Sequence, residues 1–547
     1  MNRSAWTLTV ILLAFGAILL YAANPFSESD SFYHLKTGEL IWETRSIPQS
    51  DPFSYTAEGR PWVPHEWLAQ LLFYGISVLG GLQAVVWFAA LLGALTYFIL
   101  FRMLIRRGAD PVLSLLLLFL AGFLTLELWV GRPQVFAYLC LALLLFSLER
   151  YRFGGGVIYL WLAAGTMWLW ANVNASFLLG LAVLGLYLAA SLAKRYFPRL
   201  GVPGTLPVRN MLLVLLASLT LSFLTPAGYQ AFLYPFYIRP AVAALKVYEW
   251  RSILEYAAES EAKVFLAEVS LAAVFLAWWL GFRKQSRDPI LLLLIAGASV
   301  LPFISARHAG FWPILAGYPL ALGISEILKP VYANASSKKL WGGVAFVFLV
   351  FIGARSIGFP EMPVDRRAVP VAAAEFLAEN RIRGPLFNFY NEGGFLIWRF
   401  YPEEKVFIDG RSEVYPPEVI SEYFEIATAG EDWVELVDRK YGINYFLISY
   451  RTLSPSVIRL VQVLMQRNWV LAYWDDAAVI FLRNIPAHEE AIGKYGLRHV
   501  SPFREPGDIP PEESMAAAAE LKVLLERSPE SDAVRDYLRA FLGTRSQ

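Results

Sequence analysis

The segment Glu28-Ser29-Asp30-Ser31-Phe32-Tyr33-His34-Leu35-Lys36 opens a polar stretch that ends at Pro64-His65-Glu66-Trp67. This polar stretch, residues 28–67, follows the first apolar segment of the chain and holds two of its five histidines. It also contains two acidic clusters and several aromatic residues. Functional residues gather in loops that a rigid scaffold positions, so this stretch is the first candidate for a site.

Composition places the chain among multi-spanning membrane proteins. Hydrophobic residues make up 57% of it and charged residues only 17%, whereas soluble domains are nearer half apolar. The net charge of +1 leaves no basic domain to neutralise phosphates, which excludes a nucleic-acid-binding function. The lone Cys140 lies in an apolar run, which excludes disulfides and cysteine metal sites.

Apolar segments predict an α-helical polytopic protein with about 11 transmembrane helices. The first, Trp6 to Ala23, is interpreted as a retained helix because no convincing cleavage site follows it. The others lie near residues 80–104, 111–130, 133–149, 156–172, 176–193, 208–225, 263–282, 288–305, 309–327 and 340–357.

Basic residues in the loops fall on one side if these spans alternate, and the positive-inside rule makes that side cytoplasmic. The N-terminus is then cytoplasmic in an inner (plasma) membrane. The polar stretch, the loop at 226–262 and everything after residue 358 face outward.

The composition changes after Pro360, where helix-like and strand-like stretches alternate and predict an extracytoplasmic α/β domain. The domains are predicted as 1–358 (transmembrane, with an external loop at 24–79), 359–495 (α/β) and 496–547 (linker and helical hairpin). The predicted helices of the α/β domain are Val371–Glu379 and Trp433–Tyr441. Its predicted strands are Leu386–Phe389, Lys405–Asp409, Tyr445–Tyr450 and a pair within Trp469–Leu482 that turns at Asp475-Asp476. The hairpin helices are predicted near 512–527 and 530–542.

Four residues of the polar stretch recur at the spacing of one helix face: Asp30, Tyr33, His34 and Thr37. A helix that starts near Ser29 would present all four on one side and turn Phe32 and Leu35 toward lipid or protein. A second surface helix is predicted from about Pro64. Each polar residue taken alone has a simpler explanation: Asp30 could be a helix N-terminal charge worth about 0.3–1 kcal/mol.

The pattern Glu28-x-Asp30-x-Phe32-Tyr33-His34-Leu35-Lys36, directly after the first span, resembles the first external loop of oligosaccharyltransferase catalytic subunits. These belong to the C superfamily of membrane glycosyltransferases (GT-C), and the order of segments is similar over most of the chain. The resemblance implies a GT-C-like fold, with Asp30 as the catalytic acidic residue and Glu28 as its neighbour.

Residues 388–395, Asn-Phe-Tyr-Asn-Glu-Gly-Gly-Phe, loosely resemble the Trp-Trp-Asp-Tyr-Gly signature of the oligosaccharyltransferase external domain. They lack both tryptophans and the aspartate, so peptide-sequon recognition is not implied. The closer likeness is to the uncharacterised bacterial members of the superfamily.

Two arginines stand at the outward ends of predicted spans, Arg132 before Pro133 and Arg307 before His308. A charge at bilayer depth is costly unless it is paired or faces water, which makes both functional candidates. The alternative is snorkelling toward lipid head groups. If they point into one cavity, Arg132, Arg307 and His308 would bind the phosphate of a polyprenyl-linked donor.

Candidate substrate-binding residues share the predicted outward side: Tyr33, His34, His65, Glu66, Trp170, Asn172, Asn174 and Glu249. A tryptophan there could stack on a sugar or serve only as an interfacial anchor. Glu249 could equally form a solvated ion pair with Arg251. Asp409-Gly410-Arg411 is read either as a ligand site at the end of a strand or as a turn with a salt bridge.

The predicted reaction is sugar transfer from a polyprenyl-phosphate-linked donor to a lipid, glycan or protein acceptor at the outer membrane face. Asp30 would take the proton of the acceptor, with inversion at the anomeric carbon. No cofactor is required, and Asp30 with Asp51 forms an optional Mg²⁺ or Mn²⁺ site. The alternatives are a non-catalytic receptor or assembly scaffold and a lipid-linked-sugar transporter. Span centres nearly free of charge argue against coupled transport.

Overall fold

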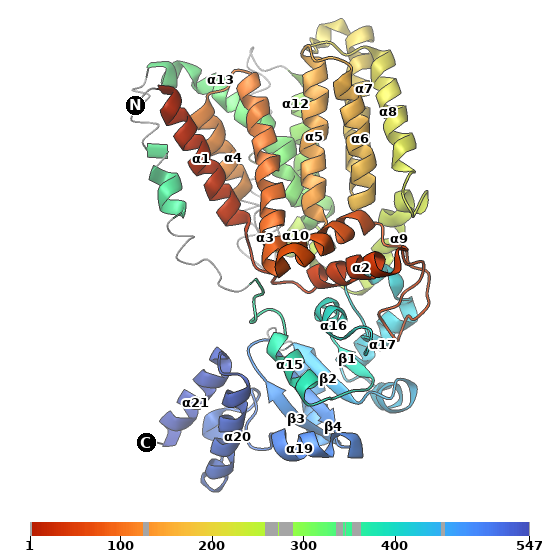
Figure 1. Ribbon diagram of the computed structural model, residues 1–547, viewed down its shortest axis with the longest axis vertical. Coiled ribbons are helices and arrows are strands. Elements are labelled where there is room, and N and C mark those ends of the chain that lie inside the picture. Colours follow the sequence, from red (N-terminus) through yellow and green to blue (C-terminus); the bar gives the residue numbers. More distant parts are fainter. Residues whose placement is uncertain are drawn as a thin grey trace. The chain divides into compact units, whose positions relative to one another are not determined.

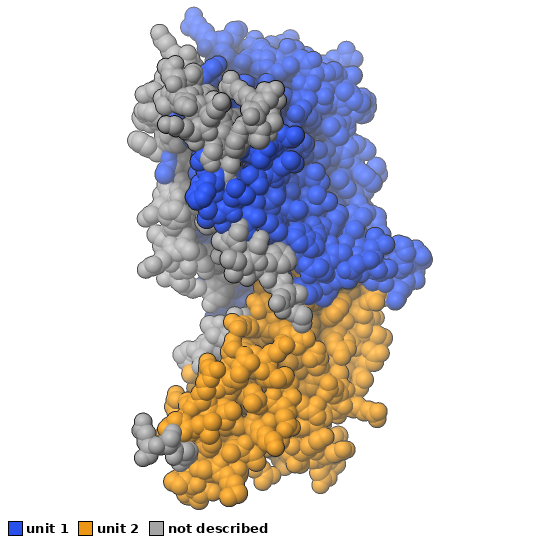
Figure 2. All heavy atoms as spheres, turned by 60° about the vertical axis from the view of Figure 1, so that its left-hand side comes forward, with its two compact units in different colours: residues 1–25, 41–47, 63–363 blue, residues 26–40, 48–62, 364–547 orange. Residues whose placement is uncertain are grey.

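The computed structural model describes residues 3–123, 131–257, 272, 288–334, 343–344, 346–352, 363–449 and 455–545. It divides into two compact units, shown in different colours in Figure 2. Unit 1 comprises Met1–Pro25, Ile41–Ile47 and Val63–Pro363. Unit 2 comprises Phe26–Leu40, Pro48–Trp62 and the C-terminal domain, Val364–Gln547. Much of the polar stretch therefore belongs to the same compact unit as the C-terminal domain.

Unit 1 is a bundle of apolar helices (Figure 1), in which α5 packs against α3 and α6, and α6 against α8. The helices are α1 (Arg3–Ala22), α3 (Trp67–Arg106), α4 (Pro111–Phe123), α5 (Gln134–Arg152), α6 (Ile158–Val173), α7 (Phe177–Tyr196), α8 (Val208–Ser222), α9 (Gln230–Ala244), α10 (Ile253–Ala257), α12 (Pro289–Ile304) and α13 (Tyr318–Asn334). Short 3₁₀ turns lie at Pro198–Leu200, η3 (Tyr248–Trp250) and η4 (Ala306–Phe311), and a π-helical turn at Pro313–Gly317.

Within the described residues, 4 helices are long and apolar enough to cross a membrane: Trp67–Arg106, Gln134–Arg152, Phe177–Tyr196 and Ala306–Lys329. Shorter apolar helices include Leu8–Ala22, Pro111–Gly122, Val208–Ser222 and Pro289–Ile304. The predicted spans at 263–282 and 340–357 fall largely or partly outside the described residues. The predicted number of spans therefore stays a prediction, whereas the helical membrane-protein character is confirmed.

Helix α3 is broken at Gly80 and Gly81, whose backbones leave the helical conformation. Gly81 has φ 67°, in the left-handed region that glycine adopts without steric cost. The surface helix predicted from Pro64 and the span predicted at 80–104 are thus two parts of one kinked helix, which begins at Trp67.

The C-terminal domain contains a four-stranded sheet in the order β1-β2-β4-β3. The strands are β1 (Leu386–Asn388), β2 (Tyr445–Ser449), β3 (Trp469–Trp474) and β4 (Ala478–Arg483). β1 is parallel to β2, and the other two pairs are antiparallel. In register, Phe387 lies opposite Phe446, and Phe446 opposite Phe481. This apolar ladder is buried.

Helices surround this sheet (Figure 1). They are α15 (Val371–Glu379), α16 (Gly393–Phe400), α17 (Pro417–Ala427), α18 (Pro455–Gln466) and α19 (Glu489–Tyr495), with a π-helical turn at Glu435–Lys440 and short 3₁₀ turns at Ser412–Val414, Pro486–His488, Pro506–Asp508 and Pro511–Glu513. The helix at Val371–Glu379 and the strand pair with its turn at Asp475-Asp476 are confirmed.

The strand predicted at Lys405–Asp409 is wrong. Val406 hydrogen-bonds in both directions with the loop of the polar stretch, to Phe53 and Tyr55, and not with the sheet. The strand pattern was therefore read correctly as extended backbone, but its partner is a loop from more than 300 residues earlier in the chain.

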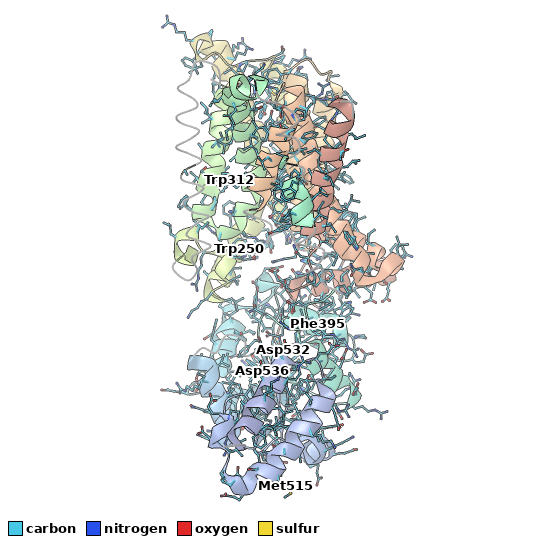
Figure 3. The ribbon with its side chains drawn as sticks, turned by 90° about the vertical axis from the view of Figure 1, so that its left-hand side faces the viewer. Trp250, Trp312, Phe395, Met515, Asp532 and Asp536 are labelled. Atoms are coloured by element: carbon cyan, nitrogen blue, oxygen red, sulfur yellow. The ribbon has the colours of Figure 1, made fainter. Side chains whose placement is uncertain are left out.

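The predicted terminal hairpin is present as α20 (Ser514–Arg527) and α21 (Asp532–Arg545), which pack on each other. Figure 3 labels Met515 on α20 and Asp532 and Asp536 on α21. The Asp476 carboxylate of the β3–β4 turn accepts from the backbone N–H of Asp532 at 3.0 Å and of Ala533 at 2.9 Å. It satisfies the first free donors of α21 and fastens the hairpin to the sheet.

Candidate active site

The predicted helix of the polar stretch is α2 (Asp30–Thr44), and Asp30 is its first residue. A carboxylate at a helix N-terminus is stabilised by the unpaired N–H groups and the helix dipole. Glu28 is exposed, two residues before the helix. The rings of Tyr33 and His34 lie 4.1 Å apart.

The N-terminus of α2 lies directly on α16 of the C-terminal domain. Phe32 contacts Phe395 and Trp398 with ring centroids 5.0 Å and 5.3 Å away, and Figure 3 labels Phe395. A β-carbon built on Gly394 would lie only 2.4 Å from the carbonyl oxygen of Ser29. Glycine at 394 therefore permits the two backbones to approach, and the aromatic contacts hold them together.

The Asp30 carboxylate rests on the backbone of Gly410. A β-carbon built there would lie 2.1 Å from Oδ1 of Asp30 and 2.9 Å from its Cγ. Within the Asp409-Gly410-Arg411 motif, the glycine is thus the residue that contacts Asp30, the predicted catalytic residue.

Arg411, next to that glycine, is buried between two carboxylates. Its Nη1 lies 2.6 Å from Asp51 Oδ1, and its Nη2 lies 2.7 Å from Asp409 Oδ2. The guanidinium also lies 4.5 Å from the ring centroid of Trp62 and 4.9 Å from that of Phe53. The two carboxylates offset the cost of burying the cation, and the turn is held rigidly.

Asp51, predicted as an optional metal ligand with Asp30, has both carboxylate oxygens engaged by protein donors. Oδ1 accepts from Arg411 and from the N–H of Phe53, and Oδ2 accepts from the backbone and hydroxyl of Ser54. Across the part of the chain that the structure describes, no group of three or more His, Cys, Asp or Glu residues is arranged to hold a metal ion.

In unit 1 the two predicted phosphate-binding arginines meet at one carboxylate. Nη1 of Arg132 lies 3.5 Å from Oε2 of Glu249, and Nη1 of Arg307 lies 3.5 Å from Oε1 of the same residue. Arg307 also lies 4.7 Å from the ring centroid of Trp250, which Figure 3 labels. All three charged side chains are partly exposed.

The three charged residues of this cluster lie in short segments next to the helices of unit 1, and a hydrogen bond joins two of these segments. Arg132 immediately precedes α5, Glu249 lies in η3, and Arg307 and His308 lie in η4. The Ser305 hydroxyl donates to the carbonyl of Glu249 at 2.9 Å. Burial raises the pKa of Glu249, but Arg307 and Arg132 outweigh it and hold that pKa below its usual value. The carboxylate is therefore charged at neutral pH, and the three groups carry a net charge of +1.

A second polar cluster of unit 1 joins four predicted substrate-binding residues. Asn174 donates to Glu66 Oε1 at 2.8 Å, and Trp67 donates from its indole to Asn172 at 2.9 Å. His65 Nε2 lies 3.6 Å from Glu66, and its ring lies 4.0 Å from that of Tyr234.

Gln134 also accepts from Asn174, at 3.3 Å, and it stands two positions after Arg132. It was not predicted as a site residue, although its place in Arg-Pro-Gln was a usable signal. Trp170, in contrast, is fully buried and donates to Ser176 at 3.1 Å, so in this structure it packs inside the bundle.

No family model and no curated protein matches this sequence. Solved structures, however, match its fold. One is the archaeal oligosaccharyltransferase AglB from Archaeoglobus fulgidus, in complex with an inhibitory peptide and a dolichol-phosphate. It matches with a TM-score of 0.55 at 11% identity, and the match covers 99% of this chain and 86% of AglB. ArnT from Cupriavidus metallidurans, bound to undecaprenyl phosphate, gives a TM-score of 0.53 at 12% identity over 89% of this chain and 99% of its own.

The chain shares its fold with these two GT-C glycosyltransferases. The predicted resemblance is thereby confirmed at the level of the fold. An Archaeoglobus fulgidus oligosaccharyltransferase in the apo form also matches, with a TM-score of 0.53 at 12% identity over 88% of this chain and 75% of its own.

Proposed function

We propose that the chain is an integral membrane glycosyltransferase that moves a sugar from a polyprenyl-phosphate-linked donor to an acceptor at the outer face of the plasma membrane. The observation that carries the proposal is the pair of arginines that share one anion in unit 1. Guanidinium groups bind phosphate oxygens in a bidentate manner, which suits two of them to a lipid phosphate. The structures of similar fold that contain dolichol-phosphate or undecaprenyl phosphate support this ligand class.

In the proposed reaction Asp30 acts as the general base, with Glu28 nearby. Asp30 removes the proton from the hydroxyl oxygen or amide nitrogen of the acceptor while that oxygen or nitrogen attacks the anomeric carbon of the donor sugar. The bond from that carbon to the lipid phosphate breaks, with inversion, and the leaving phosphate keeps the electron pair. Arg132 and Arg307, with His308 beside them, stabilise the charge that develops on this phosphate.

The hydrogen-bonded residues His65, Glu66, Asn172 and Asn174 offer donors and acceptors for sugar hydroxyls. The acceptor is a lipid, a glycan or a protein. A divalent cation, Mg²⁺ or Mn²⁺, is an optional addition near Asp30.

Binding of undecaprenyl phosphate to the purified full chain in nanodiscs tests the proposal. The variant with both Arg132→Gln and Arg307→Gln is expected to bind at least about 100-fold more weakly, because each of the two lost charged hydrogen bonds is worth roughly 1.5–3 kcal/mol. Arg102→Gln, at an exposed position of α3, is the matched control and should bind like the wild type. Equal binding by the double variant would contradict the proposal.

A further inference from the structure

We infer that Gly410 is a positioning residue for Asp30 and that the Asp409-Gly410-Arg411 turn of the C-terminal domain forms the surface that aims the catalytic carboxylate. The inference rests on the role that the proposed function gives to Asp30. It assigns the C-terminal domain a part in the chemistry in addition to any part in acceptor binding.

The first argument is steric. The carboxylate of Asp30 occupies the space where residue 410 would carry a side chain, since a β-carbon there would lie 2.1 Å from Oδ1. Real β-carbons essentially never come within 3.0 Å of a heavy atom outside their own residue and its two chain neighbours. Every residue other than glycine at 410 must therefore displace the carboxylate or the turn.

The second argument is that the turn cannot easily move. The Asp409 Oδ1 atom accepts from the backbone N–H of Arg411 at 2.9 Å and from its Nε at 2.8 Å. The carbonyl of Gly410 accepts from the Tyr390 hydroxyl at 3.0 Å and from the N–H of Ser412 at 3.0 Å. These hydrogen bonds hold the backbone before and after Gly410. A side chain added at position 410 would therefore displace the carboxylate of Asp30 rather than the turn.

The third argument separates Gly410 from its neighbours in the structure. A β-carbon on Gly393 would lie 2.1 Å from the carbonyl oxygen of Ile408, and one on Gly394 would lie 2.4 Å from that of Ser29. Those substitutions collide with backbone and would disturb folding. At Gly410 the obstructing atoms belong to the Asp30 side chain and not to the backbone, so the substitution acts on the direction of the carboxylate.

The experiment compares Gly410→Ala with the control Gly493→Ala, at a helical glycine of α19 whose β-carbon would meet open space. The assay uses membranes from source cells in which the gene for the protein is deleted and each variant is expressed instead. These membranes receive a panel of radiolabelled undecaprenyl-phosphate hexoses as donors. The initial rate at saturating donor, the donor concentration at half-maximal rate and undecaprenyl phosphate binding are measured.

For Gly410→Ala we expect a rate about 100-fold lower, as for other misplaced catalytic groups, with undecaprenyl phosphate binding and half-saturation unchanged. Gly493→Ala should match the wild type. In the Asp30→Asn background, Gly410→Ala should cause no further loss, because both changes act through one carboxylate. A wild-type rate for Gly410→Ala, or full additivity with Asp30→Asn, would overturn the inference.

Thermal unfolding gives a readout that does not depend on activity. If Gly410→Ala lowers the unfolding temperature, then the added Asp30→Ala substitution should restore it by removing the colliding atoms. Failure to restore it would also overturn the inference. A wild-type rate for Asp30→Asn would refute the base role of Asp30 on which the inference rests. A slow Asp30→Asn beside a fast Gly410→Ala would refute only the positioning role of Gly410.

Discussion

Glu249 is the anion that Arg132 and Arg307 share in the described structure, and a lipid phosphate would have to compete with it. Replacing a charge about 3.5 Å from both guanidinium groups removes an interaction of roughly 1 kcal/mol or more near a protein surface. Glu249→Gln is therefore expected to tighten the binding of undecaprenyl phosphate about five- to tenfold, as measured in nanodiscs by titration.

The matched control for this substitution is Glu43→Gln, an exposed position of α2 that belongs to unit 1. It removes the same charge without touching the arginines, so its affinity should stay at the wild-type value. Weaker binding by Glu249→Gln would show that the carboxylate orients the arginines and does not compete with the ligand.

The sequence singled out individual site residues only where the predicted membrane position of a residue limits which side chains can stand there. Arg132 and Arg307 were singled out because a charge at bilayer depth is costly unless it is paired or faces water. Their common partner Glu249 was noted, but nothing in the sequence states that three distant segments meet. Trp170 was predicted to bind substrate from its residue type and its place at the predicted outward end of a span. Its burial depends on the packing of α6 against neighbours that the sequence does not reveal.

At the scale of elements, the turn at Arg411 depends on a buried ion-pair triad with Asp51 and Asp409. Arg411→Met would leave the carboxylates of Asp51 and Asp409 buried without their cation. Breaking a buried pair in this way typically costs about 3–5 kcal/mol. We expect a clearly lower unfolding temperature for this variant in detergent, followed by intrinsic fluorescence.

Arg439→Met serves as the control, because Arg439 forms an exposed ion pair with Glu435 on a helical turn. Exposed pairs contribute little, so its unfolding temperature should remain close to that of the wild type. Similar unfolding temperatures for both variants would mean that the triad does not stabilise unit 2.

The sequence patterns located most elements, because the spacing of apolar residues and turn signals is a local property. The helix that starts at Asp30, the strand pair around Asp475 and the terminal hairpin were all predicted. The strand at Lys405–Asp409 failed because the backbone of Val406 pairs with a distant loop, and Phe407 and Ile408 bond to the side chain of Asn388 rather than to the backbone of a strand. Which partner an extended segment chooses is decided by tertiary contacts, which local pattern does not contain.

At the scale of the molecule, the two compact units do not follow the order of the chain. Residues 26–40 and 48–62 belong with the C-terminal domain, and the segments between and around them belong with the helical bundle. The polar stretch was recognised as the centre of the chain from its composition. Its union with the C-terminal domain involves the close backbone approach at Gly394 and the pairing of Asp51 with Arg411, contacts more than 300 residues apart.

The central claim, that Asp30 is the base of a glycosyl transfer, is tested most directly by Asp30→Asn. The substitution keeps the size of the side chain and removes its basicity. Transfer from the undecaprenyl-phosphate hexoses should fall by about 10²–10⁴-fold, while membrane insertion and undecaprenyl phosphate binding stay at wild-type levels. Wild-type transfer by Asp30→Asn would contradict the claim, because the transfer would then proceed without this carboxylate.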